Sequence, residues 1–70
     1  MNYTSERRAV YQIKADGSRQ FLFEGLSIVS AMVAAHCLNE AAGAHRCSEH
    51  LVATDHDLIQ KCSICATEFA

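Results

Sequence analysis

Apolar and polar side chains alternate along two stretches near the start of the chain, residues 8–14 and 19–24. This alternation is typical of β-strands, and the residues between the two stretches favour a turn. We expect a β-hairpin with a three-residue loop, 15–17, in which Gly17 takes the left-handed backbone conformation.

The length of this loop fixes which side chains lie opposite each other in the hairpin. The predicted register pairs Tyr11 with Phe21 and Ala9 with Phe23, so that the large apolar side chains lie on one side. We expect the following residues to form one buried face: Tyr11, Ile13, Phe21 and Phe23.

A helix is predicted over residues 27–42. Ser27 can cap its first turn, and Gly43 can take the left-handed conformation that ends a helix. The helix is apolar almost all round, so it needs cover on more than one side. The hairpin, the C-terminal segment or a second copy of the chain could supply this cover, and a homodimer through the helix is one expectation.

Two pairs of metal-binding side chains follow the helix. Cys47 and His50 form one pair, Cys62 and Cys65 form the other, and each pair has a two-residue spacer. A tight turn can aim both members of such a pair at one point, and thiolate and imidazole ligands suit zinc. The sequence therefore predicts a structural Zn²⁺ site with Cys47, His50, Cys62 and Cys65 as its ligands.

Between the pairs, the apolar stretches 51–53 and 58–59 flank a polar turn, which predicts a second short hairpin. With a ligand pair at each end, residues 47–65 resemble a zinc-ribbon module, whose two knuckles are linked by a β-hairpin. The resemblance implies structural zinc and allows contact with DNA or RNA. It does not extend to the first 46 residues, which resemble no family.

Other ligand sets stay open. His45 is the strongest substitute for His50, because the sequence does not fix which of these two rings faces the ion. Three weaker alternatives are His36, Cys37 and His56. We expect Cys37 to behave as a small apolar residue that is buried on the helix.

Enzymatic interpretations are disfavoured. Four protein ligands saturate a zinc ion, whereas catalytic zinc sites usually keep an open position for water. The spacing of Cys62 and Cys65 also matches a thioredoxin-like redox motif, but only five residues follow Cys65, too few for the helix that this motif needs. We therefore expect a protein that is not an enzyme.

Charge and cysteine content narrow the expected partner and compartment. The net charge is −2 and the basic residues are scattered, whereas nucleic-acid binders usually cluster them. A protein partner is favoured, with nucleic acid as the alternative. Nothing in the first 14 residues has the pattern of a secretory signal, so we expect a reducing cytoplasm. A disulfide-stabilised or metal-free interaction domain is the third interpretation.

Together the patterns predict a single α+β domain over residues 1–70. Its parts are an N-terminal β-hairpin at 8–24 packed on one apolar helix at 27–42, and a C-terminal zinc-ribbon-like module at 47–66. We expect the domain to bind, and to inhibit or modulate, a larger protein or complex. By analogy with other small acidic proteins, a phage or mobile-element origin is expected, with host machinery such as a defence complex or polymerase as the target and the host cytoplasm as the location.

Overall fold

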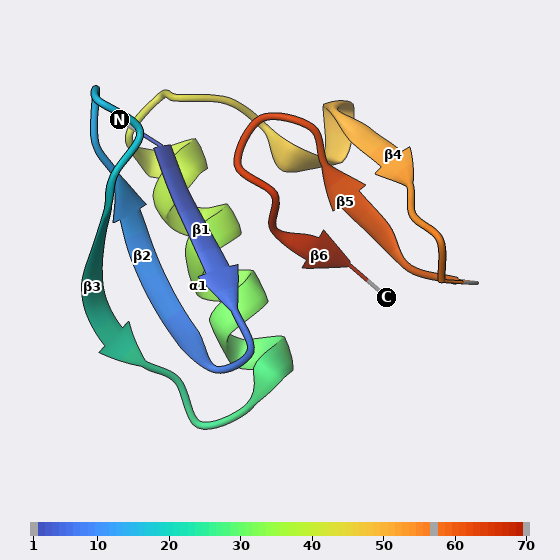
Figure 1. Cartoon of the computed structure of the whole chain (residues 1–70), viewed down its shortest axis with the longest axis horizontal. Coiled ribbons are helices and arrows are strands. Elements are labelled where there is room, and N and C mark those ends of the chain that lie inside the picture. Colours follow the sequence, from blue (N-terminus) through green and yellow to red (C-terminus); the bar gives the residue numbers. More distant parts are fainter. Residues whose placement is uncertain (1, 57, 70) are drawn as a thin grey trace.

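The computed structural model describes residues 2–56 and 58–69, and this part of the chain forms an α+β fold, as predicted. The N-terminal antiparallel sheet has the order β1-β2-β3 and the C-terminal one the order β4-β5-β6. The elements are β1 Asn2–Glu6, β2 Ala9–Ile13, β3 Arg19–Glu24, α1 Ile28–Ala41, η1 Cys47–Glu49, β4 Leu51–Ala53, β5 Gln60–Cys62 and β6 Glu68–Phe69. Helix α1 lies between the two sheets in sequence and runs along the N-terminal sheet in space (Figure 1).

Strand β1 adds a third strand to the predicted hairpin. It pairs antiparallel with β2, and Glu6 lies opposite Ala9 across a tight turn in which Arg7 has a φ of 55°. The hairpin prediction began at residue 8 and omitted this strand, because its sequence from Asn2 to Glu6 has no alternation of apolar residues. Its place in the sheet comes from pairing with β2 and from contacts with α1.

The loop between β2 and β3 has the predicted form. The Lys14 N–H donates to the Ser18 carbonyl at 2.8 Å, the Gly17 N–H donates to the Lys14 carbonyl at 2.9 Å, and Gly17 has a φ of 87°. Tyr11 lies opposite Phe21, as predicted. The register then shifts between Val10 and Tyr11.

This β-bulge corrects the predicted pairing of Ala9 with Phe23. Ala9 lies opposite Glu24, and Phe23 lies opposite Val10. A bulge places an extra residue on one strand and changes which side chains share a face beyond it. Alternation along the sequence therefore gives the correct pairs on only one side of the bulge.

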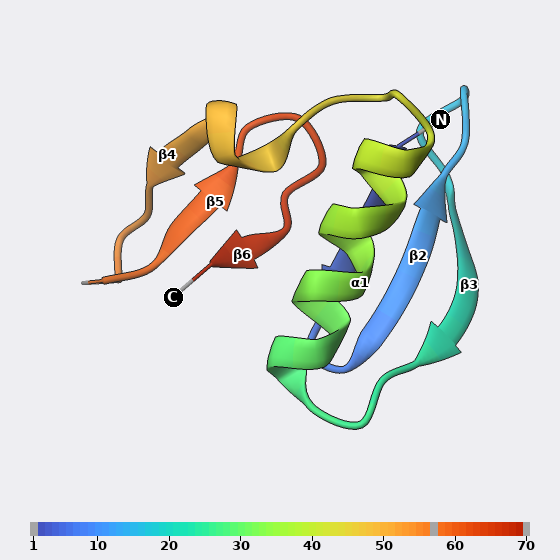
Figure 2. The same cartoon turned by 180° about the vertical axis from the view of Figure 1, so that it is seen from behind.

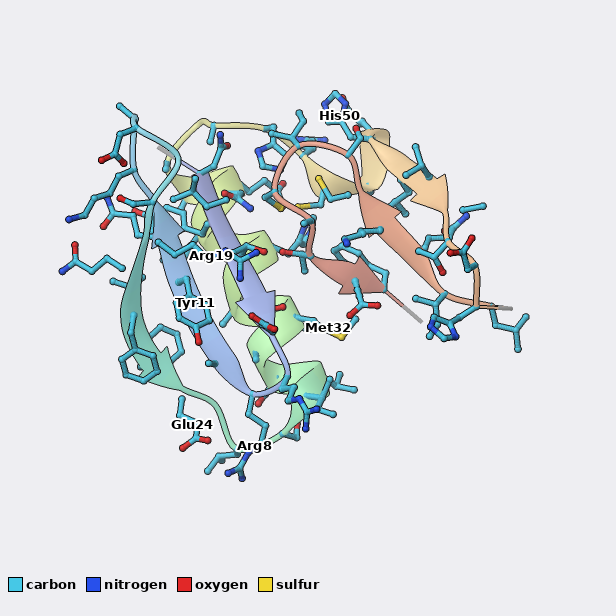
Figure 3. All side chains as sticks on the ribbon, viewed as in Figure 1. Arg8, Tyr11, Arg19, Glu24, Met32 and His50 are labelled. Atoms are coloured by element: carbon cyan, nitrogen blue, oxygen red, sulfur yellow. The ribbon has the colours of Figure 1, made fainter. Side chains whose placement is uncertain are left out.

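The predicted buried face of the hairpin is also wrong. Phe21 and Phe23 are 56% and 42% exposed, whereas the buried residue of this hairpin is Val10, which packs against Ala31 and Ala35 of α1. Helix α1 packs against β1 and β2, and every residue of β3 is exposed. Figure 3 shows Tyr11 and Arg19 on the side of the sheet away from the helix.

Helix α1 begins and ends where the sequence predicts. Ser27 and Ser30 form a reciprocal capping box at its start. At its end Gly43 has a φ of 68°, and the N–H groups of Gly43 and Ala44 donate to the carbonyls of Glu40 and Asn39. This pattern of two hydrogen bonds is the Schellman motif.

One side of α1 faces the N-terminal sheet, as both views show (Figures 1 and 2), and another side keeps apolar residues exposed. The large exposed ones are Ile28, Val29 and Val33. Cys37 is exposed as well, which corrects the expectation that it is buried. Within residues 2–56 and 58–69, no helix is long and apolar enough to cross a bilayer.

The C-terminal sheet contains the predicted strand at 51–53, paired with β5. The second predicted strand, 58–59, precedes β5, and Leu58 has a φ of 67° that takes it out of extended geometry. Strand β6 was not predicted. The ring of Phe69 in β6 makes an edge-to-face contact with His36 of α1 at 5.7 Å, which joins this sheet to the helix.

Candidate metal centre

Three cysteines and one histidine come together where the C-terminal module meets α1. The ligand atoms of His45, Cys47, Cys62 and Cys65 all lie within 4.8 Å of one another. The three thiols are buried and unbridged. Ile13 and Phe69 pack against them, so the group lies within a small apolar core that both sheets contribute to.

The fourth member of this group is His45 and not His50. The Nε2 atom of His45 lies 3.4 Å from the Cys47 sulfur and 3.3 Å from the Cys62 sulfur. His50 was the predicted ligand, and its ring lies outside the group, 5.9 Å from the His45 ring between centroids. Figure 3 shows His50 on the outer side of the module, pointing away from it.

The local backbone explains why His45 is the histidine that joins the group. Arg46 is extended, with φ −105° and ψ 113°. In an extended segment residues i and i+2 point to the same side, so His45 and Cys47 face one point while Arg46 points away and pairs with Glu40. A His-x-Cys spacing in an extended segment is the sequence signal for this arrangement.

His50 contributes through its backbone. Its N–H donates to the Cys47 carbonyl at 3.0 Å, and its carbonyl accepts from the Ser63 N–H at 2.8 Å. These bonds hold the segment that carries Cys47 next to the one that carries Cys62 and Cys65. The short helix η1 thus positions one ligand and clamps the segment that bears the other two.

Residues 62–66 fold as a tight knuckle. The Ala66 N–H donates to the Cys62 carbonyl at 2.9 Å, and Ala66 has a φ of 66°, a left-handed value that usually favours glycine. The turn directs the N–H groups of Ile64 and Cys65 at the sulfur of Cys62. Such N–H donors stabilise a thiolate.

The protonation properties of the thiols differ within the group. Burial raises the pKa of Cys47 to about 12, and the adjacent Cys65 adds to this shift. Burial is the largest single influence on Cys62 and acts to raise its pKa, but the N–H groups of Cys65 and Ile64 and the thiols of Cys65 and Cys47 together leave this pKa lowered. Burial lowers the pKa of His45, and the nearby His50 adds to that effect. The imidazole is therefore neutral at neutral pH.

Three polar residues that the sequence analysis did not select surround the ligands. Asn2 Oδ1 lies 2.9 Å from Nδ1 of His45, Asn39 Nδ2 lies 3.5 to 3.6 Å from two of the sulfurs, and the Thr67 hydroxyl lies 3.2 Å from the Cys65 sulfur. Asn39 and Thr67 are fully buried. Asn2 gives no local signal because it lies 43 positions from His45, whereas Asn39 lies eight positions from Cys47 and Thr67 two from Cys65.

The other candidate residues do not belong to the group. Cys37 is exposed on α1, and His56 is exposed in the turn after β4. His36 is half-buried, and its Nε2 lies 3.4 Å from a carboxylate oxygen of Glu40. The exposure or the contacts of each of these side chains are therefore explained without a metal ion.

The fold and the site together define an α+β protein with a compact Cys₃His group that has the arrangement of a four-coordinate metal site. Comparison with protein-family models, with curated proteins and with solved structures gives no match to this chain.

Proposed function

We propose that the Cys₃His group binds one structural Zn²⁺ ion through His45, Cys47, Cys62 and Cys65. Zn–S bonds of about 2.3 Å and Zn–N bonds of about 2.0 Å at tetrahedral angles imply sulfur pairs about 3.8 Å apart and sulfur–nitrogen pairs about 3.5 Å apart. The corresponding separations are 3.7 Å for Cys47 and Cys65 and 3.3 to 3.4 Å from His45 Nε2 to two sulfurs. This agreement is the observation on which the proposal depends.

The surrounding polar groups support the same conclusion. The Nδ1–H of His45 can donate to Asn2 Oδ1, which leaves the lone pair on Nε2 for the ion. All three thiols have amide N–H donors at their sulfurs: Asn39 lies against those of Cys47 and Cys65, and the 62–66 knuckle serves that of Cys62. Four protein ligands leave no position for water, so the ion would stabilise the fold and the protein would not be an enzyme. A module of this kind resembles a zinc ribbon.

Native mass spectrometry under reducing conditions, before and after a strong chelator, tests the zinc proposal. We expect one zinc per chain and a shift to unfolded charge states when the metal is removed. The Cys37→Ala variant is the matched control, because Cys37 is exposed and outside the group. A protein that folds with no metal and four free thiols would refute the proposal.

We further propose that the protein acts by binding a larger protein through the exposed apolar residues of β3, the following loop and the first half of α1, which we call the 21–33 surface. The exposed apolar residues of this 21–33 surface are Phe21, Leu22, Phe23, Leu26, Ile28, Val29 and Val33. The most exposed of these residues is Leu26, at 95%. Monomeric proteins rarely expose apolar patches of this kind unless they bind a partner.

The charges near the 21–33 surface favour an apolar partner. Glu24 forms an ion pair with Arg8 at 3.0 Å, and Arg19 forms one with Glu6 at 3.1 Å. From Ser27 to Asn39 the chain has no Asp, Glu, Lys or Arg. The paired charges add no net charge at the edge of the surface, so the matching surface on the partner needs apolar rather than charged side chains.

A pair of variants that each introduce a negative charge tests this surface. Tagged wild-type protein, Val29→Asp and the control Leu58→Asp would be cross-linked in the native cells, and the captured protein would then be purified for affinity measurements. Leu58 is 91% exposed but lies in the C-terminal hairpin. We expect Val29→Asp to weaken binding to the purified partner at least tenfold and Leu58→Asp to leave it unchanged. Equal affinities would refute the proposed surface.

A nucleic-acid partner is the second candidate, because zinc ribbons contact DNA or RNA. Two contacts count against it: Arg46 pairs with Glu40 at 3.6 Å, and Lys61 lies opposite Glu68 on the neighbouring strand. Gel shifts at low salt would test for a nucleic-acid partner, since binding to phosphates is strongest there and weakens steeply as salt is added. Inhibition of host machinery and a phage origin stay predictions from size and charge.

A further inference from the structure

Asn39 is fully buried in the last turn of α1, and both ends of its side-chain amide are used. Its Oδ1 accepts a hydrogen bond from the Tyr3 N–H at 2.6 Å, and its Nδ2 donates to the Tyr3 carbonyl at 2.9 Å. The amide thus pairs with β1 as the backbone of a neighbouring strand would. These two bonds fix its orientation, because a reversed amide would place oxygen against oxygen.

The same orientation aims the second N–H of Nδ2 at the metal centre. That nitrogen lies 3.6 Å from the Cys47 sulfur and 3.5 Å from the Cys65 sulfur. One N–H serves the Tyr3 carbonyl, so the other is shared between the two sulfurs. A donor in this position is more strongly held when the sulfurs are thiolates bound to a cation, because hydrogen bonds to charged acceptors are the stronger ones.

A second link joins the same strand to the same centre. Asn2, the neighbour of Tyr3 in β1, lies with its Oδ1 2.9 Å from Nδ1 of His45. Two consecutive residues of β1 therefore contact the metal centre, one through a histidine ligand and one through Asn39. Both links connect residues at least 36 positions apart, so they depend on the tertiary fold.

We propose that Asn39 is a positioning residue of the metal centre. Through it, binding of the metal ion is coupled to the packing of strand β1. The proposal rests on the zinc site proposed above. A bound ion holds Cys47 and Cys65 at the separation that one N–H can bridge, and this keeps the amide in the orientation that Tyr3 requires. Loss of the ion therefore loosens β1 of the N-terminal sheet as well as the C-terminal module.

Amide hydrogen exchange during a stepwise removal of zinc from the wild-type protein tests the coupling. We expect the protection of the β1 amides to fall together with that of β4 and β5, at the same fraction of bound zinc. Retention of β1 protection after the β4 and β5 amides have become exposed would overturn the proposal. This measurement needs no variant and does not depend on whether a substitution folds.

Variants of Asn39 supply the second test, with zinc affinity measured by chelator competition. Asn39→Ala removes the shared donor, and loss of such a partner typically lowers metal affinity 10- to 100-fold. Asn39→Asp keeps the size but places a carboxylate oxygen near the thiolates, so we expect a larger loss. The control is Cys37→Ala, an exposed residue of α1 outside the group, with unchanged affinity expected.

The outcomes separate this inference from the zinc proposal. Affinities of both Asn39 variants within about twofold of the wild type would overturn the positioning role while leaving the zinc site in place. A purely structural role for Asn39 would lower stability without changing affinity in the folded protein, and this result would also overturn the proposal. Failure of the wild type to bind zinc would refute both.

Discussion

The sulfur of Cys47 lies 3.7 Å from the sulfur of Cys65, although the two residues are 18 positions apart in the sequence. This separation is far longer than a disulfide bond of about 2.05 Å and matches two ligands on one tetrahedral ion. The α1 residue Asn39 lies against both sulfurs. The side-chain amide of Asn39 therefore links both sulfurs of the metal centre to the N-terminal sheet.

Replacing a cysteine of the centre should have a far greater effect than replacing the exposed one. We expect Cys62→Ser to lose zinc and to unfold the C-terminal module, because structural zinc contributes on the order of 10 kcal/mol of folding free energy. Cys37→Ala should change the free energy of unfolding by less than about 0.5 kcal/mol, since Cys37 is exposed. Metal content and chemical denaturation measure both effects. Zinc loss in Cys37→Ala with retention in Cys62→Ser would mean that the ligand set is wrong.

The two neighbouring histidines give a direct test of the fourth ligand. His45→Ala should weaken zinc binding by at least about 100-fold, because it removes a ligand whose Nε2 faces two sulfurs. His50→Ala should leave the affinity within a few-fold of the wild type, since the structural bonds of His50 are made by its backbone. Chelator competition on both variants measures the difference. The reverse order of effects would restore His50 as the ligand.

Zinc affinity should depend on pH through the thiols. Burial raises the pKa of Cys47 to about 12, so at neutral pH this thiol carries a proton that metal binding must displace. Burial lowers the pKa of His45 from its ordinary value, so the imidazole is already neutral. Apparent affinity should rise between about pH 6 and 8, roughly tenfold per unit for each proton released, and fall as the solution is acidified. Chelator competition at several pH values measures this slope, and a flat profile would contradict the prediction.

The hairpin loop offers a test that does not involve the metal. Gly17 has a φ of 87°, and a Cβ placed there meets no atom within 4 Å, so only backbone strain opposes a side chain. Gly17→Ala should lower the free energy of unfolding by about 1–2 kcal/mol. Gly17→Asn should cost less, because asparagine tolerates the left-handed region better. Denaturation of the zinc-loaded protein compares them, and equal losses would show that φ is not the cause.

The elements set by neighbouring residues could be predicted from the sequence. Ser27 and Gly43 determine where α1 begins and ends, and Gly17 determines the three-residue loop between β2 and β3. Capping and turn formation depend on the backbone within a few residues, so their signals are local. The spacing of Cys62 and Cys65 is local in the same sense, and the structure places both in one group with Cys47.

Long-range packing decided the remaining features. Strand β1 has no apolar pattern, and it joins the sheet through pairing with β2 and through Asn39. The bulge beside Val10 and the position of α1 over β1 and β2 leave β3 exposed, which alternation along the chain could not reveal. Side-chain exposure depends on what other elements cover, and that is a property of the whole fold.

The identity of the fourth residue of the metal centre also depends partly on the sequence and partly on the tertiary structure. The sequence by itself determined that cysteines and a nearby histidine could chelate, because chelation needs only suitable side chains at short spacing. The tertiary structure chose His45 over His50, since the extended backbone at Arg46 turns His45 towards the sulfurs and Asn2, 43 positions away, contacts its Nδ1. A ligand's direction is set by backbone conformation and distant contacts, and residue spacing alone does not contain either.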